Sequence, residues 1–210
     1  LLDGSMLVLG GEDSLSMGAC EPVLMAERHR TEEVFHVPNP GWMPMVPQAV
    51  GRAYHSVAGL LPDGRVFLAG GAGGNGPQGS RHTLEYYSPP YTYILRPEIQ
   101  TAPTGIQDWG TQFPINIKQA GSGSLAQIER VALLRPSAAT HAWDSSQRYI
   151  ELEFEDQGGS WDDRDLVLTI PAKHPAGAGD YMIPPGFYLL TVVDRQHSPS
   201  PAVWIQIGNV

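Results

Sequence analysis

Short apolar runs separated by turns rich in glycine and proline dominate the chain. Most runs are five to eight residues long, and in several of them apolar and polar side chains alternate. In residues 149–154, for example, Ile150 and Leu152 alternate with Glu151 and Glu153. A period of two is typical of a half-buried β-strand, because successive side chains point to opposite faces. The pattern therefore predicts an all-β protein.

An internal repeat organises the N-terminal part. An Asp-Gly pair at residues 3–4 precedes an apolar run that ends in a double glycine at 10–11. The same arrangement recurs at residues 63–64 and 70–71, an offset of 60 residues (63 minus 3). Asp-Gly suits a tight hairpin turn, and a double glycine suits a strand end where backbones approach closely.

Each copy of the repeat continues into a variable loop and a strand with aromatic residues, expected at 33–38 and 84–89. This resembles a kelch repeat, the unit that forms one four-stranded blade of a β-propeller. Residues 1–95 supply about two blades, whereas a propeller closes with at least about four. We therefore expect the missing N-terminal blades on the same polypeptide or on an associated fragment.

A second kind of β sequence begins near Arg96-Pro97. Prolines become frequent and six strand-like runs follow, at residues 113–117, 130–134, 149–154, 165–170, 186–193 and 202–207. Six or seven strands in the 115 residues from 96 to 210 predict an immunoglobulin-like β-sandwich. The expected organisation is thus a partial kelch propeller over 1–95 and an immunoglobulin-like domain over 96–210.

Charge and cysteine content exclude several classes of protein. The chain has 13 Lys and Arg against 22 Asp and Glu, a net charge of -9, which argues against a nucleic-acid partner. No apolar run reaches the roughly 20 residues that cross a bilayer, so no membrane partner is predicted. Cys20 is the only cysteine, so no disulfide can form within these residues, and a buried thiol is the simpler reading than a reactive one.

The adjacent pair Tyr54-His55 is the first candidate for chemistry. It stands just before a predicted strand that leads into the second Asp-Gly turn. Both side chains can bind one metal ion only where the backbone is irregular, since a regular strand would direct them to opposite faces. Ordinary hydrogen-bonded packing is the alternative for such a pair.

His141 is the second candidate. It lies on a loop, residues 136–148, between two predicted strands, and a loop held at both ends is well placed to project from its own domain. A surface histidine is the alternative interpretation. The other histidines show no spacing typical of metal ligands: they are His29, His36, His82, His174 and His197.

Taken in order along the chain, several segments resemble the galactose oxidase and glyoxal oxidase family. Residues 52–56 with 60–65 resemble its Tyr-His ligand motif, and residues 140–148 resemble its C-terminal ligand loop. Its closing hairpin resembles residues 184–190 followed by 199–204. In that family an immunoglobulin-like domain follows the propeller and sends a loop carrying a histidine into the propeller's centre.

The resemblance implies a copper site with His55 and His141 as imidazole ligands and Tyr54 as an axial phenolate and general base. Nitrogen and oxygen donors of this kind suit Cu(II). The family's fourth protein ligand is a tyrosine cross-linked to a cysteine, which carries a radical. No tyrosine precedes Tyr54 in this chain, so the Tyr-Cys cofactor is expected on sequence upstream, and Cys20 is not assigned to it.

The implied function is that of a secreted copper radical oxidase, of which this chain is the C-terminal part and is not competent alone. Such an enzyme oxidises a primary alcohol, an aldehyde or a carbohydrate with O2 and releases H2O2. The alternative is a non-catalytic extracellular matrix or carbohydrate-binding relative that keeps the fold and lacks the radical cofactor. A cysteine and a tyrosine upstream would distinguish the two.

Overall fold

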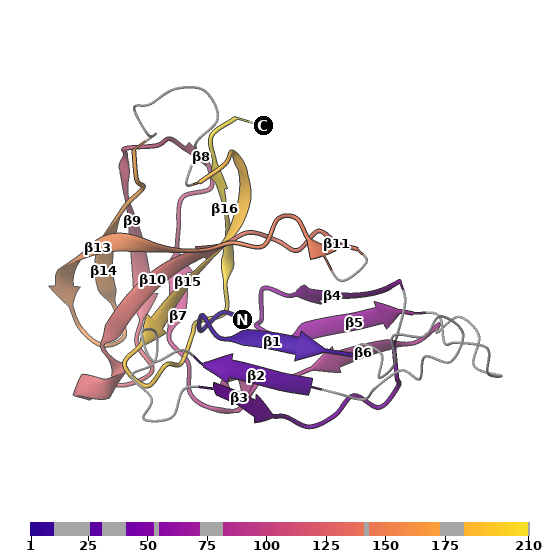
Figure 1. Ribbon diagram of the computed structural model, residues 1–210. Helices are drawn as coiled ribbons and strands as arrows, with labels where there is room; N and C mark the ends of the chain where they lie inside the picture. The colour runs from indigo at the N-terminus through magenta and orange to yellow at the C-terminus, as the bar shows by residue number, and fades with distance from the viewer. Residues whose placement is uncertain are drawn as a thin grey trace. The chain divides into compact units, whose positions relative to one another are not determined.

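The computed structural model (Figure 1) describes residues 1–10, 26–30, 41–52, 55–71, 82–140, 143–172 and 183–209. Within these ranges the regular structure consists of β-strands and two short 3-10 helices, η1 (Pro90–Tyr93) and η2 (Ser124–Ala126). The prediction of an all-β protein is therefore confirmed. No helix among the described residues is long and apolar enough to cross a membrane.

The chain divides into two compact units. The first comprises residue 1, residues 3–89 and residues 137–146, and the second comprises residue 2, residues 90–136 and residues 147–210. Segment 137–146 thus groups with the N-terminal strands, although its neighbours in sequence belong to the second unit. The domain limits expected from the sequence, 1–95 and 96–210, stay a prediction.

Two three-stranded antiparallel sheets form the first unit. The first has the order β1 (Met6–Leu9), β2 (Ala26–Arg30) and β3 (Gly41–Pro44). The second has the order β4 (Ser56–Leu60), β5 (Val66–Gly70) and β6 (Leu84–Tyr87). The strand expected at 84–89 is β6, whereas the one expected at 33–38 lies outside the described residues.

The internal repeat seen in the sequence is also a repeat of structure. Before β1 the backbone N–H of Ser5 donates to the Asp3 carboxylate (3.1 Å), and before β5 the N–H of Arg65 donates to the Asp63 carboxylate (2.9 Å). An aspartate that accepts a bond from the N–H two residues on holds a tight turn. Both strands therefore start from the same turn, as expected for successive blades.

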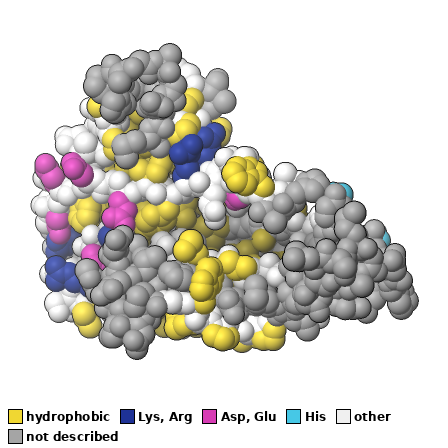
Figure 2. Space-filling view, in the orientation of Figure 1, with side chains coloured by type: hydrophobic (Ala, Val, Ile, Leu, Met, Phe, Trp, Pro, Cys, Tyr) yellow, Lys and Arg dark blue, Asp and Glu magenta, His cyan; other side chains and the backbone are white. Residues whose placement is uncertain are grey.

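Large apolar side chains reach the surface of both three-stranded sheets, and Figure 2 shows several patches of hydrophobic side chains on the face in view. On β1, β3 and β6 the exposed fractions lie between 40 and 52%, for Met6, Val8, Trp42, Met43, Leu84 and Tyr86. Strands of an antiparallel sheet normally bury one apolar face. The described residues leave these faces uncovered.

One curled sheet of eight strands forms the second unit, in the order β7-β9-β14-β13-β10-β15-β16-β8. Its strands are β7 (Glu98–Thr101), β8 (Ile106–Gln107), β9 (Gln112–Lys118), β10 (Ile128–Leu134), β13 (Tyr149–Gly159), β14 (Arg164–Thr169), β15 (Gly186–Asp194) and β16 (Val203–Ile207). All six strand-like runs of the sequence are strands, and β7 and β8 are additional.

Strand β13 joins the two halves of this sheet. Its first part, residues 149–152, pairs with β10, and its second part, residues 153–159, pairs with β14. The strand runs five residues beyond the end expected at Phe154, through a register shift between Asp156 and Gly158. A bulge of this kind bends a strand, so the sandwich-like fold here is a continuous sheet curled around its core.

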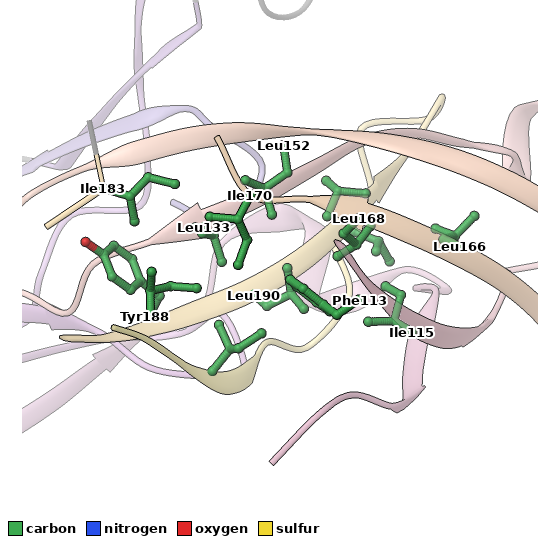
Figure 3. Packing of buried hydrophobic residues seen from close by; sticks show 14 of the residues in the cluster. Phe113, Ile115, Leu133, Leu152, Leu166, Leu168, Ile170, Ile183, Tyr188 and Leu190 are labelled. Carbon is green, nitrogen blue, oxygen red and sulfur yellow. The ribbon is translucent and has the colours of Figure 1, made fainter. Parts of the chain in front are cut away.

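The core of the second unit lies between the two halves of the curled sheet (Figure 3). Leu152 of β13, Leu168 of β14 and Leu190 of β15 are buried there. The alternation read from residues 149–154 is confirmed, because Leu152 points inward while Glu151 and Glu153 are exposed. Burying each such side chain stabilises the fold by about 1.5–3 kcal/mol.

Candidate metal centre

Of the three residues expected to bind copper, the structure describes His55, whereas Tyr54 and His141 lie outside the described residues. His55 is exposed and directly precedes β4. Its backbone is left-handed, with a φ of 63°. Few residues other than glycine adopt this conformation, and it persists only where the surrounding structure holds it.

The left-handed backbone at His55 interrupts the strand alternation at the predicted ligand pair. Because regular alternation would direct neighbouring side chains to opposite faces, two adjacent ligands require such an interruption. The left-handed backbone at His55 meets this condition on the His55 side, and metal binding by Tyr54 and His55 stays a prediction. Ser56, the first residue of β4, pairs with Gly70 at the end of β5.

The residues on either side of 141–142 form a short hairpin that contacts β4. It consists of β11 (Ala139–Thr140) and β12 (Trp143–Asp144), with Thr140 opposite Trp143. Within the first unit, β11 lies against β4 (Figure 1). His141 directly follows β11 and His55 directly precedes β4, so the two predicted histidine ligands flank neighbouring strands.

Asp144 shapes this hairpin, a role that the sequence reasoning missed. One of its carboxylate oxygens accepts hydrogen bonds from the backbone N–H groups of Ala138 and Ser146, each 3.0 Å long. The aspartate therefore joins the two arms of the hairpin on either side of residues 141–142. The signal in the sequence is an aspartate two residues before a serine, which is typical of an aspartate-stabilised turn.

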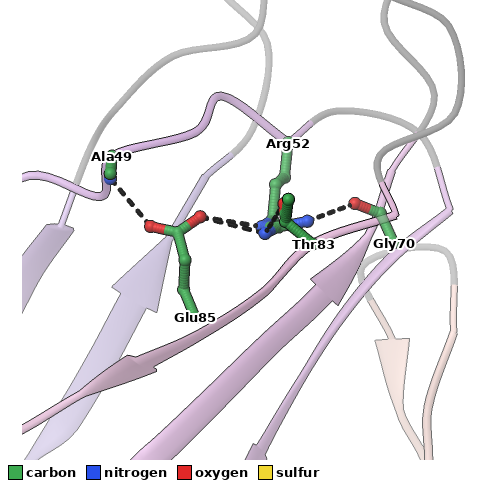
Figure 4. Close-up of polar contacts among 5 residues, drawn as sticks. All are labelled: Ala49, Arg52, Gly70, Thr83 and Glu85. Carbon is green, nitrogen blue, oxygen red and sulfur yellow. Dashed lines mark hydrogen bonds and ion pairs between the residues drawn. The ribbon is translucent and has the colours of Figure 1, made fainter.

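Arg52, two residues before Tyr54, is the largest fully buried side chain among the residues that the structure describes, with an exposed fraction of 1%. Its guanidinium donates to the Gly70 carbonyl (2.8 Å), to the Thr83 hydroxyl (2.9 Å) and to the Glu85 carboxylate (3.0 and 3.2 Å) (Figure 4). The second Glu85 oxygen accepts the N–H of Ala49 at 2.8 Å. The sequence placed Arg52 only within the segment that resembles the Tyr-His ligand motif, and it did not predict these hydrogen bonds.

Two glycines lie close to the backbone carbonyls of Arg52 and His55. Gly10 and Gly70, at corresponding positions of the repeat, both have a φ of 67°. A Cβ atom at Gly10 would lie 2.9 Å from the Arg52 carbonyl oxygen, and one at Gly70 would lie 3.0 Å from that of His55. The double glycines thus permit the close backbone approach that their sequence pattern indicated.

The donor chemistry of the predicted set suits copper. A phenolate and two imidazoles provide the oxygen and nitrogen donors that Cu(II) prefers. Within the part of the chain that the structure describes, no group of three or more His, Cys, Asp or Glu side chains is placed to hold a metal ion. The predicted ligands Tyr54 and His141 lie outside that part, so the ligand set stays a prediction.

Blade-like sheets in one unit and a curled immunoglobulin-like sheet in the other define a propeller-and-sandwich protein. Comparison with known families agrees with this class: residues 96–207 match the galactose oxidase-like, early set domain. The match covers more than half of the chain, which therefore belongs to the galactose oxidase-like family.

Curated relatives carry oxidase names. The chain is 29% identical to the aldehyde oxidase GLOX of Vitis pseudoreticulata, over 97% of this chain and 39% of that protein. It is 28% identical to the galactose oxidase of Gibberella zeae, over 99% of this chain and 28% of that protein. The chain thus spans well under half the length of these relatives.

A solved structure resembles the whole chain. It is that of a fungal alcohol oxidase of the AA5 family in complex with copper, with a TM-score of 0.72 and 25% sequence identity. The likeness covers 99% of this chain and 40% of that one. The fold class expected from the sequence is therefore confirmed.

Proposed function

We propose that Tyr54, His55 and His141 are three of the protein ligands of a copper site in an alcohol or aldehyde oxidase. The observation that carries this proposal is the contact of β11 with β4, which brings the segment ending before His141 to the segment beginning after His55. The left-handed backbone at His55 supports it, because two adjacent ligands need an interrupted strand.

The reaction that follows is RCH2OH + O2 → RCHO + H2O2. The substrate carbon is oxidised by two electrons, and O2 takes up both electrons and two protons. Bound copper supplies one-electron redox chemistry for the exchange with O2. Tyr54, as a phenolate, would take the hydroxyl proton of the substrate as general base, and His55 and His141 would hold the copper ion through their imidazole nitrogens.

The substrate class rests on the relatives, whose names include aldehyde, galactose and alcohol oxidases. For an aldehyde, its hydrate offers the hydroxyl group from which Tyr54 takes the proton. The fourth protein ligand, a tyrosine cross-linked to a cysteine, would come from further propeller blades on the same polypeptide or an associated fragment. Secretion is proposed from family membership.

The test uses the complete protein that contains this chain, loaded with copper. We expect H2O2 release with galactose, glyoxal or simple primary alcohols. His55→Ala and His141→Ala should each weaken copper binding by more than the ~10–100-fold seen when a residue that only orients a ligand is changed. His82→Ala is the matched control, since His82 is an exposed histidine of the same unit.

Two results would overturn the proposal in different ways. Copper binding that is unchanged in both ligand variants would place the metal elsewhere. Copper binding that depends on His55 and His141, without H2O2 from any substrate, would instead favour the non-catalytic relative.

A further inference from the structure

A buried arginine, Arg52, lies two residues before the predicted ligand pair Tyr54-His55. Removing a guanidinium from water is costly unless its charge is neutralised and its donors are paired. Arg52 meets both conditions, because Nε, Nη1 and Nη2 all donate and Glu85 carries the opposite charge. Together these hydrogen bonds hold the buried side chain closely in one position.

The partners of Arg52 lie on two neighbouring strands. Gly70 is the last residue of β5, Thr83 directly precedes β6, and Glu85 is the second residue of β6 (Figure 4). Through Glu85 the network also holds the N–H of Ala49. Residues 49–52 are thereby tied to the same end of the second sheet as His55, where β4 and β6 start and β5 stops.

Two left-handed glycines also lie close to the backbone of Arg52 and of His55. The carbonyl of Arg52 faces Gly10 at the end of β1, and the carbonyl of His55 faces Gly70 at the end of β5. The Gly70 carbonyl in turn accepts the bond from Arg52 Nη1. Gly70 thus lies against the His55 carbonyl and also accepts a hydrogen bond from Arg52.

We propose that Arg52 is a positioning residue for the metal centre. By holding residues 49–52 and Gly70, it maintains the left-handed backbone of His55 and hence the direction in which the Tyr54-His55 pair presents its donors. The conformation at His55 is intrinsically unfavourable, so it requires contacts of this kind to persist. The role in copper binding rests on the proposed function.

A second ion pair in the same sheet provides a matched control. Arg65 Nε lies 2.7 Å from Asp63, in the turn between β4 and β5, at the opposite end of these strands from His55. Its two side chains are 43 and 47% exposed, whereas Arg52 is buried. An exposed pair of this kind contributes little to stability.

The experiment compares Arg52→Lys with Arg65→Lys in the complete protein. Lysine keeps the positive charge but lacks the planar fork that serves Gly70, Thr83 and Glu85 together. We expect Arg52→Lys to weaken copper(II) binding by ~10-fold or more and to change the copper hyperfine pattern in electron paramagnetic resonance. Arg65→Lys should leave both unchanged. In the metal-free protein, amide exchange in residues 52–56 should accelerate only in Arg52→Lys.

If Arg52→Lys does not fold, Glu85→Gln replaces it, because glutamine keeps the side-chain shape and removes the opposite charge. A folded Arg52→Lys or Glu85→Gln protein with the copper affinity, spectrum and amide exchange of the parent would overturn the inference. If the parent itself binds no copper through His55 and His141, the proposed function fails. The exchange measurement on metal-free protein still decides whether Arg52 holds the segment.

Discussion

Buried polar side chains differ in how fully they are paired, and Asp194 is the contrast to Arg52. Asp194 ends β15 and is completely buried. Its Oδ1 accepts the N–H groups of Gln196 and Ser198, each at 2.9 Å, while Oδ2 has no hydrogen-bond partner among the described residues. Burial raises the pKa of Asp194; the two backbone bonds oppose this shift and nearby Glu129 adds to it.

The raised pKa of Asp194 predicts a pH dependence of stability. Because the folded protein holds this proton more tightly than the unfolded chain, the stabilising contribution is complete below the ordinary value of 3.8. It is lost as the pH rises through the raised pKa. Asp194→Asn keeps the Oδ1 acceptor but does not titrate.

We therefore expect the free energy of unfolding of the parent to fall, relative to that of Asp194→Asn, as the pH rises from about 4 toward neutrality. Urea unfolding of both proteins across this range measures the difference, and contributions from groups that do not interact with Asp194 cancel. A constant difference between the two proteins would contradict the assignment.

At the scale of strands, the ends of β1 and β5 depend on glycine. Gly70→Ala would place a Cβ in a left-handed backbone and 3.0 Å from the His55 carbonyl. We expect a loss of about 1–2 kcal/mol in the free energy of unfolding, measured by urea denaturation. Gly121→Ala is the control, since a Cβ there meets no atom within 4 Å. An equal, small effect in both variants would argue against the close approach.

Strand length decided which elements the sequence predicted. The six runs of five residues or more gave a readable period or apolar block, and all are strands. Strands β8, β11 and β12 have only two residues each, too few for any periodicity to appear. The extension of β13 to Gly159 was missed because it includes a register shift, at which alternation breaks.

At the scale of the whole molecule, the exposed apolar faces of the first unit predict how the chain behaves alone. Side chains on β1, β3 and β6 leave hydrophobic surface that neighbouring blades cover in a closed propeller. We expect the isolated 210-residue chain to bind a hydrophobic dye and to self-associate, as followed by light scattering.

A complete protein with further blades should do neither at the same concentration. A Trp42→Ser, Leu84→Ser double variant of the isolated chain should self-associate less, since both side chains are about half exposed. A monodisperse isolated chain without dye binding would contradict this prediction.

The sequence alone determined the strand pattern, the 60-residue repeat, the change of texture near residue 96 and the resemblance that pointed to Tyr54, His55 and His141. These are local features, because periodicity, turn residues and the order of motifs can be read directly along the chain. Only the tertiary structure decided that β11 lies against β4, that Arg52 is buried against Glu85, and that Gly10 and Gly70 lie against the carbonyls of Arg52 and His55. Those facts depend on which segments distant in sequence meet, and pairing across 33 residues, as between Arg52 and Glu85, leaves no periodic trace.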